Sequence, residues 1–511
     1  MRALAVRQAI AVLLLGVLLF FLTFYGLGER ELWSSHEGRA AQDAQTILDG
    51  GDWRLPRLFD GRPELQKPPL YYWLTAGFGW LRGRVDEVAV RLPAALACIL
   101  SMFALLILCR LSRSSTDSVS SNEQTRMGML CMLILCTMIH FTWMSRVGRI
   151  DMPLTAACSW CITGFLRGQG AAGWKRSCWY LLGYLSLAAG LMLKGPIAIV
   201  LVGLVLGPFL LYQAWRDRIS LRSILLSTVW GLPLVAVLIL PWVLWVNAVT
   251  EGQFIQEFFI KHNMQRGFGG DEQLDGHIHP WYFYLWRLWL DTAPWSLLLP
   301  AALYTWYALP KRPMLPLLGL WWFSSIVIAL SCLQYKRADY LLPAYPGLAL
   351  FLGWTVTHWL AHWEPLRVKF AWRMGLATVV CLGMGWISYV SWILPRLEPG
   401  RSLGSFARTV REYLPAPGQV ILFRVDSHHL NWELGKKTER IWEWENLGWW
   451  ATRPMPIYVV MPARYAAECA KELPEGKLYP LARTTDGQPE HDLPLVLLVN
   501  EQLPATRLAN R

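Results

Sequence analysis

The chain has 511 residues, of which 54% are hydrophobic and 16% are charged, and 30 are tryptophan. Because soluble globular domains carry about 25% charged residues, this composition excludes an ordinary soluble protein and indicates a polytopic membrane protein. The net charge of +12 does not indicate nucleic-acid binding, since the cations recur in short segments between apolar runs, where they orient membrane helices.

The first predicted element is the apolar run Ala9–Leu27, which is long enough to cross a bilayer and has no clear signal-peptidase site. A polar segment from residue 28 to residue 68 follows, and we expect it to form an outer loop. Residues 37–48 of this loop have helical periodicity, which Asp49-Gly50-Gly51 ends. The run Leu70–Trp80 is too short to cross a bilayer and is predicted to be an interfacial helix.

Apolar runs then alternate with short charged connections up to residue 394. The predicted spans with definable limits are 88–108, 127–144, 224–248, 281–310, 314–331, 341–360 and 374–394. A further span runs from the turn at Asp151 back to Arg167, and a pair of spans after it is broken at 193–196. Residues 250–280 are predicted to form a second long outer loop. Every connection assigned to the inside carries at least two Lys or Arg residues. The alternation of inside and outside connections along the chain therefore predicts about eleven spans.

From Pro395 to Arg511 the composition is that of a small soluble domain. Short apolar runs predict strands at 419–423, 456–461 and 495–499, and 463–473 predicts a helix, so we expect an α/β domain. The predicted organisation is therefore a transmembrane domain over residues 1–394 and an extracytoplasmic domain over 395–511. The glycine pairs do not follow a strand and open a helix, so no nucleotide site is predicted.

Ionisable residues gather on the predicted outer face, where they can serve chemistry on an anionic lipid head group. Cations there can neutralise a phosphate and a carboxylate can accept a proton. The residues concerned are Glu37 and Arg39 in the first loop, Lys67, Arg149, Asp151, Lys194, the 250–280 loop and 335–340. Ionisable residues at membrane depth are costly and usually functional.

Each of these residues also has a purely structural interpretation. Glu37 and Arg39 can form a solvated pair while Lys67 extends to the interface, Asp151 can pair with Arg149, and Lys194 can cap a helix. His277 and His279 can be ordinary surface histidines. At the level of the whole protein, the alternatives to an enzyme are a transporter of polyprenyl-linked lipids and a structural subunit. A transporter should place ionisable residues within its spans, and here they lie mostly in loops.

Several segments resemble the superfamily of dolichyl-phosphate-mannose protein mannosyltransferases and aminoarabinose (lipid A) transferases, which are membrane glycosyltransferases of the GT-C fold. The similar segments occur in family order between Trp33 and Leu350: GDWRLPRLFDGRPELQKPPLYYW ending at Trp73, RLP at 91–93, GRIDMPLT at 148–155, LKGP at 193–196, HPWYFYLWRLWLDTAPWSLLLP at 279–300, and KRADYLLPAYPGLAL at 336–350. The KPPLYYW element is the most specific of these. The C-terminal domain carries none of the motifs.

The resemblance implies that a sugar is transferred, with inversion, from a polyprenyl phosphate to a lipid, protein or glycan at the outer face of a bacterial inner membrane. It further implies that Arg39, Lys67, Lys194, Lys336 and Arg337 hold the donor phosphate, and that Tyr71, Arg149, Tyr335, Tyr340 and His279 line the substrate pocket. The family has an Asp-Glu pair in the first outer loop, where this chain has His36-Glu37. We expect Glu37 to be the base, with His36 adjusting it and Asp151 as the rival.

One departure from the family pattern concerns metal binding. The family has an acidic residue before the lysine of the KPP element, and this chain has Gln66 there. A metal site shared with the lipid A transferases is therefore in doubt. The leaving phosphate needs electrostatic clamping rather than protonation, so the expected mechanism requires no cofactor, and the need for a divalent metal stays open.

Overall fold

The computed structural model describes residues 2–110, 121–217, 229–265, 277–414, 420–435, 438–473, 477–486 and 491–500. The chain forms two compact units, each of which is built from separate segments. The first unit comprises Met1–Tyr25, Leu65–Leu74 and Arg91–Ile387, and the second comprises Gly26–Glu64, Thr75–Val90 and Ser388–Arg511. The predicted boundary at residue 395, between a transmembrane domain and an extracytoplasmic domain, stays a prediction.

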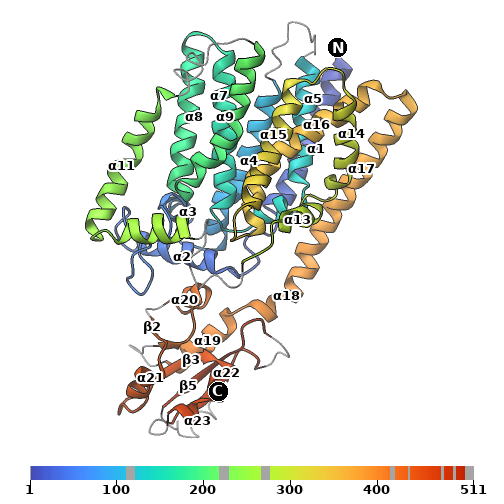
Figure 1. The fold of residues 1–511 in the computed structure, drawn as a ribbon. Coiled ribbons are helices and arrows are strands. Elements are labelled where there is room, and N and C mark those ends of the chain that lie inside the picture. Colours follow the sequence, from blue (N-terminus) through green and yellow to red (C-terminus); the bar gives the residue numbers. More distant parts are fainter. Residues whose placement is uncertain are drawn as a thin grey trace. The chain divides into compact units, whose positions relative to one another are not determined.

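The first unit is helical (Figure 1). Its elements in chain order are α1 (Arg2–Thr23), α5 (Ser121–Cys136), α6 (Ile139–Met144), α7 (Asp151–Gly170), α8 (Gly173–Lys194), α9 (Ile197–Asp217), α11 (Leu232–Val249), η1 (Ile255–Gln265), α13 (Phe283–Asp291), η3 (Trp295–Leu298), α14 (Leu299–Ala308), α15 (Met314–Ser331), η4 (Ala338–Ala344), α16 (Tyr345–His362) and α17 (Pro365–Ser388). The chain passes between the units after Tyr25, after Glu64, within α3 (Leu70–Arg82), within α4 (Glu87–Cys109), and at the end of α17.

The length and apolar composition of these helices are those of a multi-pass integral membrane protein. Among the described residues, five helical segments are long and apolar enough to cross a bilayer: α4, α9, α11, α15 and the segment that begins at Pro365. A helical membrane protein with a small C-terminal mixed sheet is as expected from the sequence. The number of spans, about eleven by charge parity, stays a prediction.

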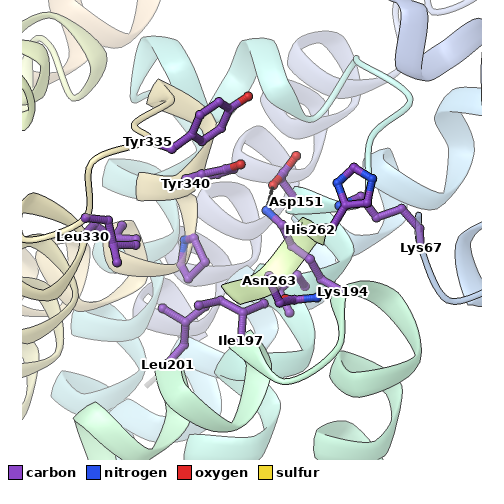
Figure 2. Close-up of a pocket in the computed structure, with 13 residues that line it drawn as sticks. Lys67, Asp151, Lys194, Ile197, Leu201, His262, Asn263, Leu330, Tyr335 and Tyr340 are labelled. Carbon is purple, nitrogen blue, oxygen red and sulfur yellow. Dashed lines mark hydrogen bonds and ion pairs between the residues drawn. The ribbon is translucent and has the colours of Figure 1, made fainter. Parts of the chain in front are cut away.

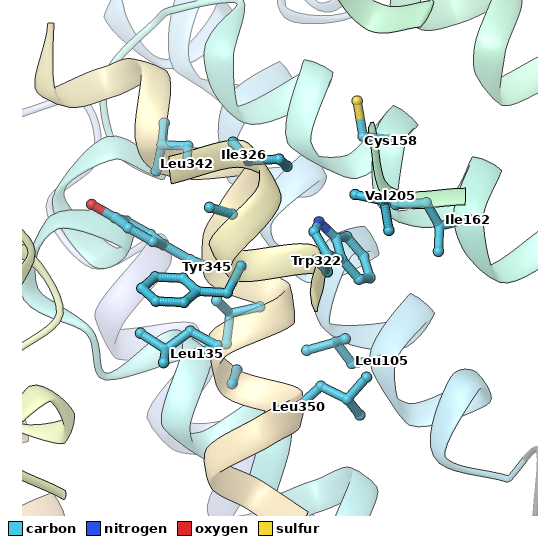
Figure 3. Close-up of a cluster of buried hydrophobic side chains, with 14 of the residues drawn as sticks. Leu105, Leu135, Cys158, Ile162, Val205, Trp322, Ile326, Leu342, Tyr345 and Leu350 are labelled. Carbon is cyan, nitrogen blue, oxygen red and sulfur yellow. The ribbon is translucent and has the colours of Figure 1, made fainter. Parts of the chain in front are cut away.

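The core of the first unit is a continuous cluster of buried apolar side chains. Figure 3 shows part of it, where Trp322 and Ile326 of α15 pack near Tyr345 and Leu350 of α16. Close approach of these two helices requires glycine, because a Cβ at Gly319 would lie 2.7 Å from the backbone nitrogen of Phe351. The indole of Trp322 is fully buried and donates a 2.8 Å hydrogen bond to the carbonyl of Pro343, so its polar atom is satisfied.

Several element boundaries differ from those predicted. The single span expected from Trp281 to residue 310 is two helices, α13 and α14, because Pro294 interrupts the helical hydrogen bonding between them. Helix α17 begins at Pro365, so Arg367 and its neighbouring cations belong to a helix rather than to a connection. The predicted loop 250–280 contains the helical segment η1, and its residues 266–276 lie outside the described residues, as do 218–228 at the start of the predicted 224–248 span.

The second unit is an α/β structure around a mixed sheet of five strands, β1 (Val420–Phe423), β2 (Thr438–Ile441), β3 (Tyr458–Pro462), β4 (Tyr479–Arg483) and β5 (Leu495–Val499), in the order β2-β1-β3-β5-β4. Strands β1, β2 and β3 are parallel, and β5 runs antiparallel to β3 and β4. Two apolar clusters cover its faces, one with α19 (Gly404–Tyr413) and α20 (His428–Leu434), the other with α21 (Trp444–Ala451) and α23 (Cys469–Glu472).

The helix predicted at 37–48 is α2 (Ser35–Leu48), and it packs against α20 within the second unit. Ser34 caps it: the Ser34 side chain accepts from the first turn while the Glu37 carboxylate accepts from the Ser34 backbone, which is a capping box. Gly38 allows the contact with α20, because a Cβ there would lie 2.6 Å from the carbonyl oxygen of His428. The other helices described for this unit after residue 388 are η5 (Tyr389–Ile393), α18 (Leu394–Arg401) and the short α22 (Ala463–Ala466). Helices α22 and α23 replace the single helix predicted at 463–473.

Candidate functional site

A cavity of about 110 Å³ lies in the first unit and brings together five of the residues predicted for the site. These five are Lys67, Asp151, Lys194, Tyr335 and Tyr340. Figure 2 shows these side chains together with His262 and Asn263 of η1. Asp151 and Lys194 belong to helices, whereas Lys67 and Tyr335 lie in connecting segments. The remaining lining residues are apolar: Leu154, Ile197, Leu201, Leu330, Leu333 and Pro343. The cavity therefore has a cationic, hydrogen-bonding part next to an apolar part.

The helix ends place an acid and a base opposite each other in this cavity. Asp151 is the first residue of α7 and Lys194 is the last residue of α8, so each charge lies at the helix terminus whose dipole stabilises it. Lys194 Nζ lies 2.5 Å from Asp151 Oδ1 and 4.3 Å from the centroid of the Tyr340 ring. The turn after Lys194 depends on Gly195, whose φ of 75° favours glycine and whose missing Cβ leaves room for Phe258. The predicted break at Lys194-Gly195-Pro196 is thus present.

A chain of buried charges continues from Asp151 away from the cavity. Arg149 Nε lies 3.3 Å from Asp151, and its Nη1 lies 2.6 Å from Asp339. Asp339 is in turn 3.5 Å from His140 Nε2. Burial alone would raise the pKa of Asp339, but the hydrogen bond with His140 and the charge of Arg149 outweigh it and hold the pKa well below its usual range. Arg149 is therefore fixed between two carboxylates.

The other predicted residues of the first unit have structural contacts of their own. The buried Lys336 donates from Nζ to the carbonyl oxygens of His279, at 2.9 Å, and of Leu333. Burial lowers the pKa of Lys336. Arg337 pairs with Asp339 at 3.6 Å, and the ring of His279 stacks on Phe283 with a centroid separation of 4.2 Å. Tyr71 is buried in α3. These four predicted residues are not among those that line the cavity.

The second unit contains three of the site residues predicted from the 28–68 segment, His36, Glu37 and Arg39. Glu37 is completely buried, and its two carboxylate oxygens lie 3.3 and 3.4 Å from the guanidinium nitrogens of Arg30. The carboxylate also accepts from the backbone of Ser34 in the capping box. His36, one residue earlier, is half-buried. In this arrangement the carboxylate of Glu37 is fully buried and paired with Arg30, so a substrate can reach it only after the surrounding side chains have moved.

Arg39 lies within a buried polar group between α2 and α20. Its Nε is 3.5 Å from Glu64, and its Nη2 is 3.1 Å from His428 Nε2. Burial and the charge of Arg39 lower the pKa of His428 to about 3, so this histidine is neutral. Asp43 is completely buried, and both of its carboxylate oxygens are without a hydrogen-bond partner. Burial, followed by the charge of Glu64, raises the pKa of Asp43 well above its usual range.

Sequence reasoning missed two sets of residues. One is the pair His262 and Asn263, which lie in a segment expected to be a loop and are brought to the cavity by η1. The other is a cluster in the second unit, where the side chains of Glu31, His429 and Glu433 approach one another. Burial and the charge of Glu31 raise the pKa of Glu433 to about 7. The available signal for the second set was the doublet His428-His429 in a domain that otherwise lacked motifs.

Comparison with known sequences identifies similarity over much of the chain. Residues 66–245 match the family model described as dolichyl-phosphate-mannose-protein mannosyltransferase. The undecaprenyl phosphate-alpha-4-amino-4-deoxy-L-arabinose arabinosyl transferase of Pseudomonas paraeruginosa is 30% identical over 368 residues, which are 71% of this chain and 62% of that protein. The corresponding transferase of Pectobacterium carotovorum is 27% identical over 78% of this chain and 68% of its own length. The chain thus spans a little under two thirds of the first of these relatives.

Comparison with solved structures identifies the fold. ArnT from Cupriavidus metallidurans bound to undecaprenyl phosphate superposes with a TM-score of 0.78 at 20% identity, covering 96% of this chain and 98% of that one. The archaeal oligosaccharyltransferase AglB from Archaeoglobus fulgidus superposes with a TM-score of 0.53 at 11% identity, covering 91% of this chain and 70% of that one. At these identities the two structures establish the shared architecture.

Proposed function

We propose that the chain belongs to the superfamily of GT-C membrane glycosyltransferases that includes the dolichyl-phosphate-mannose protein mannosyltransferases and the aminoarabinose transferases, and that it transfers a sugar from a polyprenyl-phosphate carrier. The similarities in sequence and fold support this proposal. The observation that carries the proposal is the composition of the cavity, in which Lys67 and Lys194 lie next to Ile197 and other apolar side chains. A phosphate ester on an isoprenoid chain likewise joins an anionic group, which would bind the lysines, to an apolar chain, which would bind the apolar side chains.

The proposed chemistry breaks the bond between the sugar and the carrier phosphate while the acceptor oxygen forms a new bond to the sugar carbon. The carrier phosphate leaves as an anion, which the ammonium groups of Lys67 and Lys194 stabilise electrostatically without giving up a proton. The hydroxyls of Tyr335 and Tyr340 are placed in the same cavity to donate hydrogen bonds. An incoming phosphate would share Lys194 with Asp151, which holds that ammonium in the present structure.

The acceptor hydroxyl must lose a proton, and we keep Glu37 as the proposed base with Asp151 as its rival. Glu37 requires release from Arg30 before it can act, whereas Asp151 already lines the cavity but is paired with two cations. His36 occupies the position of the family acid and is more accessible than Glu37. These differences make the three residues separable by substitution, because only the residue that accepts the proton should be intolerant of an amide.

We propose that the protein lies in a bacterial inner membrane, with the 28–68 loop and the domain after residue 395 on the outer side. Cysteines introduced at Asp49 and Glu472, both exposed, should then react with an impermeant thiol reagent in intact cells. A cysteine at Lys175, which is exposed and predicted to face the cytoplasm, should react only after the cells are opened. Labelling of Asp49 and Glu472 from opposite sides would overturn the proposed orientation.

The decisive experiment for the function uses purified protein in lipid nanodiscs with radiolabelled sugars on undecaprenyl phosphate. Candidate acceptors are lipid A, a peptide mixture and a glycan mixture, each tested with the aminoarabinose carrier and with hexose carriers. Transfer of label to one acceptor class, lost in the Lys67→Ala variant, supports the proposal. Movement of the labelled carrier across a proteoliposome membrane without any labelled product would instead support the transporter alternative.

A further inference from the structure

We propose that Glu31, His429 and Glu433 form a binding site for a divalent transition metal ion, with Zn²⁺ as the best-matched ion. All three residues belong to the second unit. Glu31 precedes α2, while His429 and Glu433 are one helical turn apart on α20. The proposal concerns this cluster alone and does not depend on the transfer reaction.

The imidazole of His429 is buried and directed between two carboxylates. The side chain of His429 is 5% exposed, and its Nε2 is buried without a hydrogen-bond partner. This atom lies 3.5 Å from Glu31 Oε2 and 3.8 Å from Glu433 Oε1, both longer than the usual N–H···O distance of about 2.7–3.2 Å. A buried imidazole nitrogen directed between two carboxylates is a ligand set typical of zinc, which binds nitrogen and carboxylate oxygen.

The separations between the ligand atoms also fit a metal ion. With ligand distances of about 2.0–2.2 Å, two ligands of a tetrahedral zinc ion lie roughly 3.4 Å apart. The two separations from His429 Nε2 are close to this value, and all three ligand atoms lie within 4.8 Å of one another. A small rotation of Glu433 would complete the geometry, and the fourth position is left for water. The side chains of Glu31 and Glu433 are 25% and 17% exposed, so an ion can reach the site from solvent.

The surroundings of Glu31 hold its carboxylate in one orientation, as is usual for metal ligands. Ser402 Oγ donates to Glu31 Oε1 at 2.7 Å, and the backbone N–H of Gly404 donates to Oε2 at 3.2 Å. A Cβ at residue 404 would collide with this carboxylate, so the contact depends on glycine. The Oε2 atom keeps a lone pair for a metal ion, because each carboxylate oxygen can accept more than one interaction.

Occupation of the site would join the segment before α2 to α20. Two carboxylates held within a few ångströms of each other repel, and a divalent cation between them would replace this repulsion by attraction. Because the unfolded chain has no preformed site, ion binding would stabilise the folded second unit. The expected role is therefore structural: the ion fixes the position of α2 against α20.

The test uses full-length protein that has been stripped with a chelator, dialysed and then titrated with Zn²⁺ alone. We expect about one zinc ion per chain by elemental analysis after desalting, together with an increase in the melting temperature. His429→Asn and Glu433→Gln should lower zinc affinity by at least 100-fold and abolish the increase. Ser402→Ala should lower it about tenfold, because it loses only an orienting contact. Glu472→Gln, an exposed carboxylate of the same unit, should bind zinc like the unaltered protein.

Two results would overturn the proposal. If the unaltered protein retains no zinc and shows no thermal shift, there is no site. If His429→Asn and Glu433→Gln retain zinc with unchanged affinity, any bound ion is held elsewhere. Glu433→Gln preserves side-chain shape, so it decides the question even if His429→Asn fails to fold. Sugar transfer is not used as a readout, so failure of this test leaves the proposed transferase activity to its own experiment.

Discussion

The ammonium of Lys194 lies 2.5 Å from the carboxylate of Asp151, and the two residues end and begin neighbouring helices. Neither charge is fully exposed, so each partly compensates the desolvation of the other. A donor phosphate entering the cavity would compete with Asp151 for Lys194. The pair is therefore a point at which donor binding and the structure of the cavity wall are coupled.

We expect this coupling to be measurable by a double-mutant cycle on thermal stability. Asp151→Asn and Lys194→Met should each destabilise the protein, because each leaves one charge without its main partner. The double variant should be more stable than the sum of the two losses predicts, by about 0.5–3 kcal/mol. Additive effects would mean that the two residues do not interact in the folded protein.

Lys67→Ala should weaken donor binding far more than it weakens folding. Loss of one charge-assisted contact to phosphate costs about 1.5–3 kcal/mol, which corresponds to a roughly 10- to 150-fold increase in Kd. Binding of undecaprenyl phosphate to the purified variant measures this directly. Lys311→Ala, which removes an exposed lysine outside the cavity, is the matched control. Equal affinity in both variants would assign Lys67 a purely interfacial role.

The catalytic and structural roles of Glu37 can be separated, because its partner Arg30 can be substituted in the same variant. Glu37→Gln removes the carboxylate from a buried ion pair with Arg30, which should destabilise the protein by about 3–5 kcal/mol. The variant Arg30→Met with Glu37→Gln removes both charges and should regain most of that stability. If Glu37 is the base, this double variant still loses transfer by roughly 100- to 10,000-fold in single-turnover assays. Recovery of transfer would assign Glu37 a positioning role and direct attention to Asp151→Asn and His36→Asn.

Asp43 should make the stability of the second unit depend on pH. Its pKa is raised in the folded state, with Glu64, Asp60 and Arg39 as the facing charges. Between the unfolded pKa of about 3.9 and the raised folded value, the folded state binds more protons, so the free energy of unfolding falls as pH rises. Asp43→Asn should therefore raise the melting temperature at pH 8, with the gain disappearing towards pH 4.

The control for this prediction is Asp49→Asn, which alters an exposed carboxylate at the end of the same helix. It should change the melting temperature little at either pH. A melting temperature for Asp43→Asn that is shifted equally at pH 4 and pH 8 would contradict the prediction, because protonation of residue 43 would then have no part in the effect.

The apolar helices were predictable from the sequence because a bilayer imposes a length and composition on each one. The limits of α15, Met314–Ser331, are those predicted from the apolar run. The strands β2 and β4 were missed because they are sheet edges: β2 has the sequence TERI, and β4 contains Pro480, which a central strand would exclude. Edge strands lack the continuous apolar run by which β1 and β5 were recognised.

The site was predictable where charged residues flank helix ends and not where polar groups are buried by tertiary packing. Lys67, Asp151 and Lys194 stand out as charges next to apolar runs, and the structure brings them to one cavity. The burial of Glu37 and Asp43 depends on the packing of α2 against α20, which no local pattern indicates. For the same reason the approach of Glu31 to His429 could not be foreseen.

The contact between α2 and α20 has a consequence for the biogenesis of the protein. Gln42 of α2 donates a 2.9 Å hydrogen bond to the carbonyl of His428, a residue 386 positions later in the chain. At a synthesis rate of about 5–20 residues per second, these positions are separated by roughly 20–80 s of translation. During that interval the Gln42 amide lacks its partner on α20, and Gly38 lacks the backbone against which it packs. Helix α2 is thus synthesised early but can complete its packing only after α20 has been made.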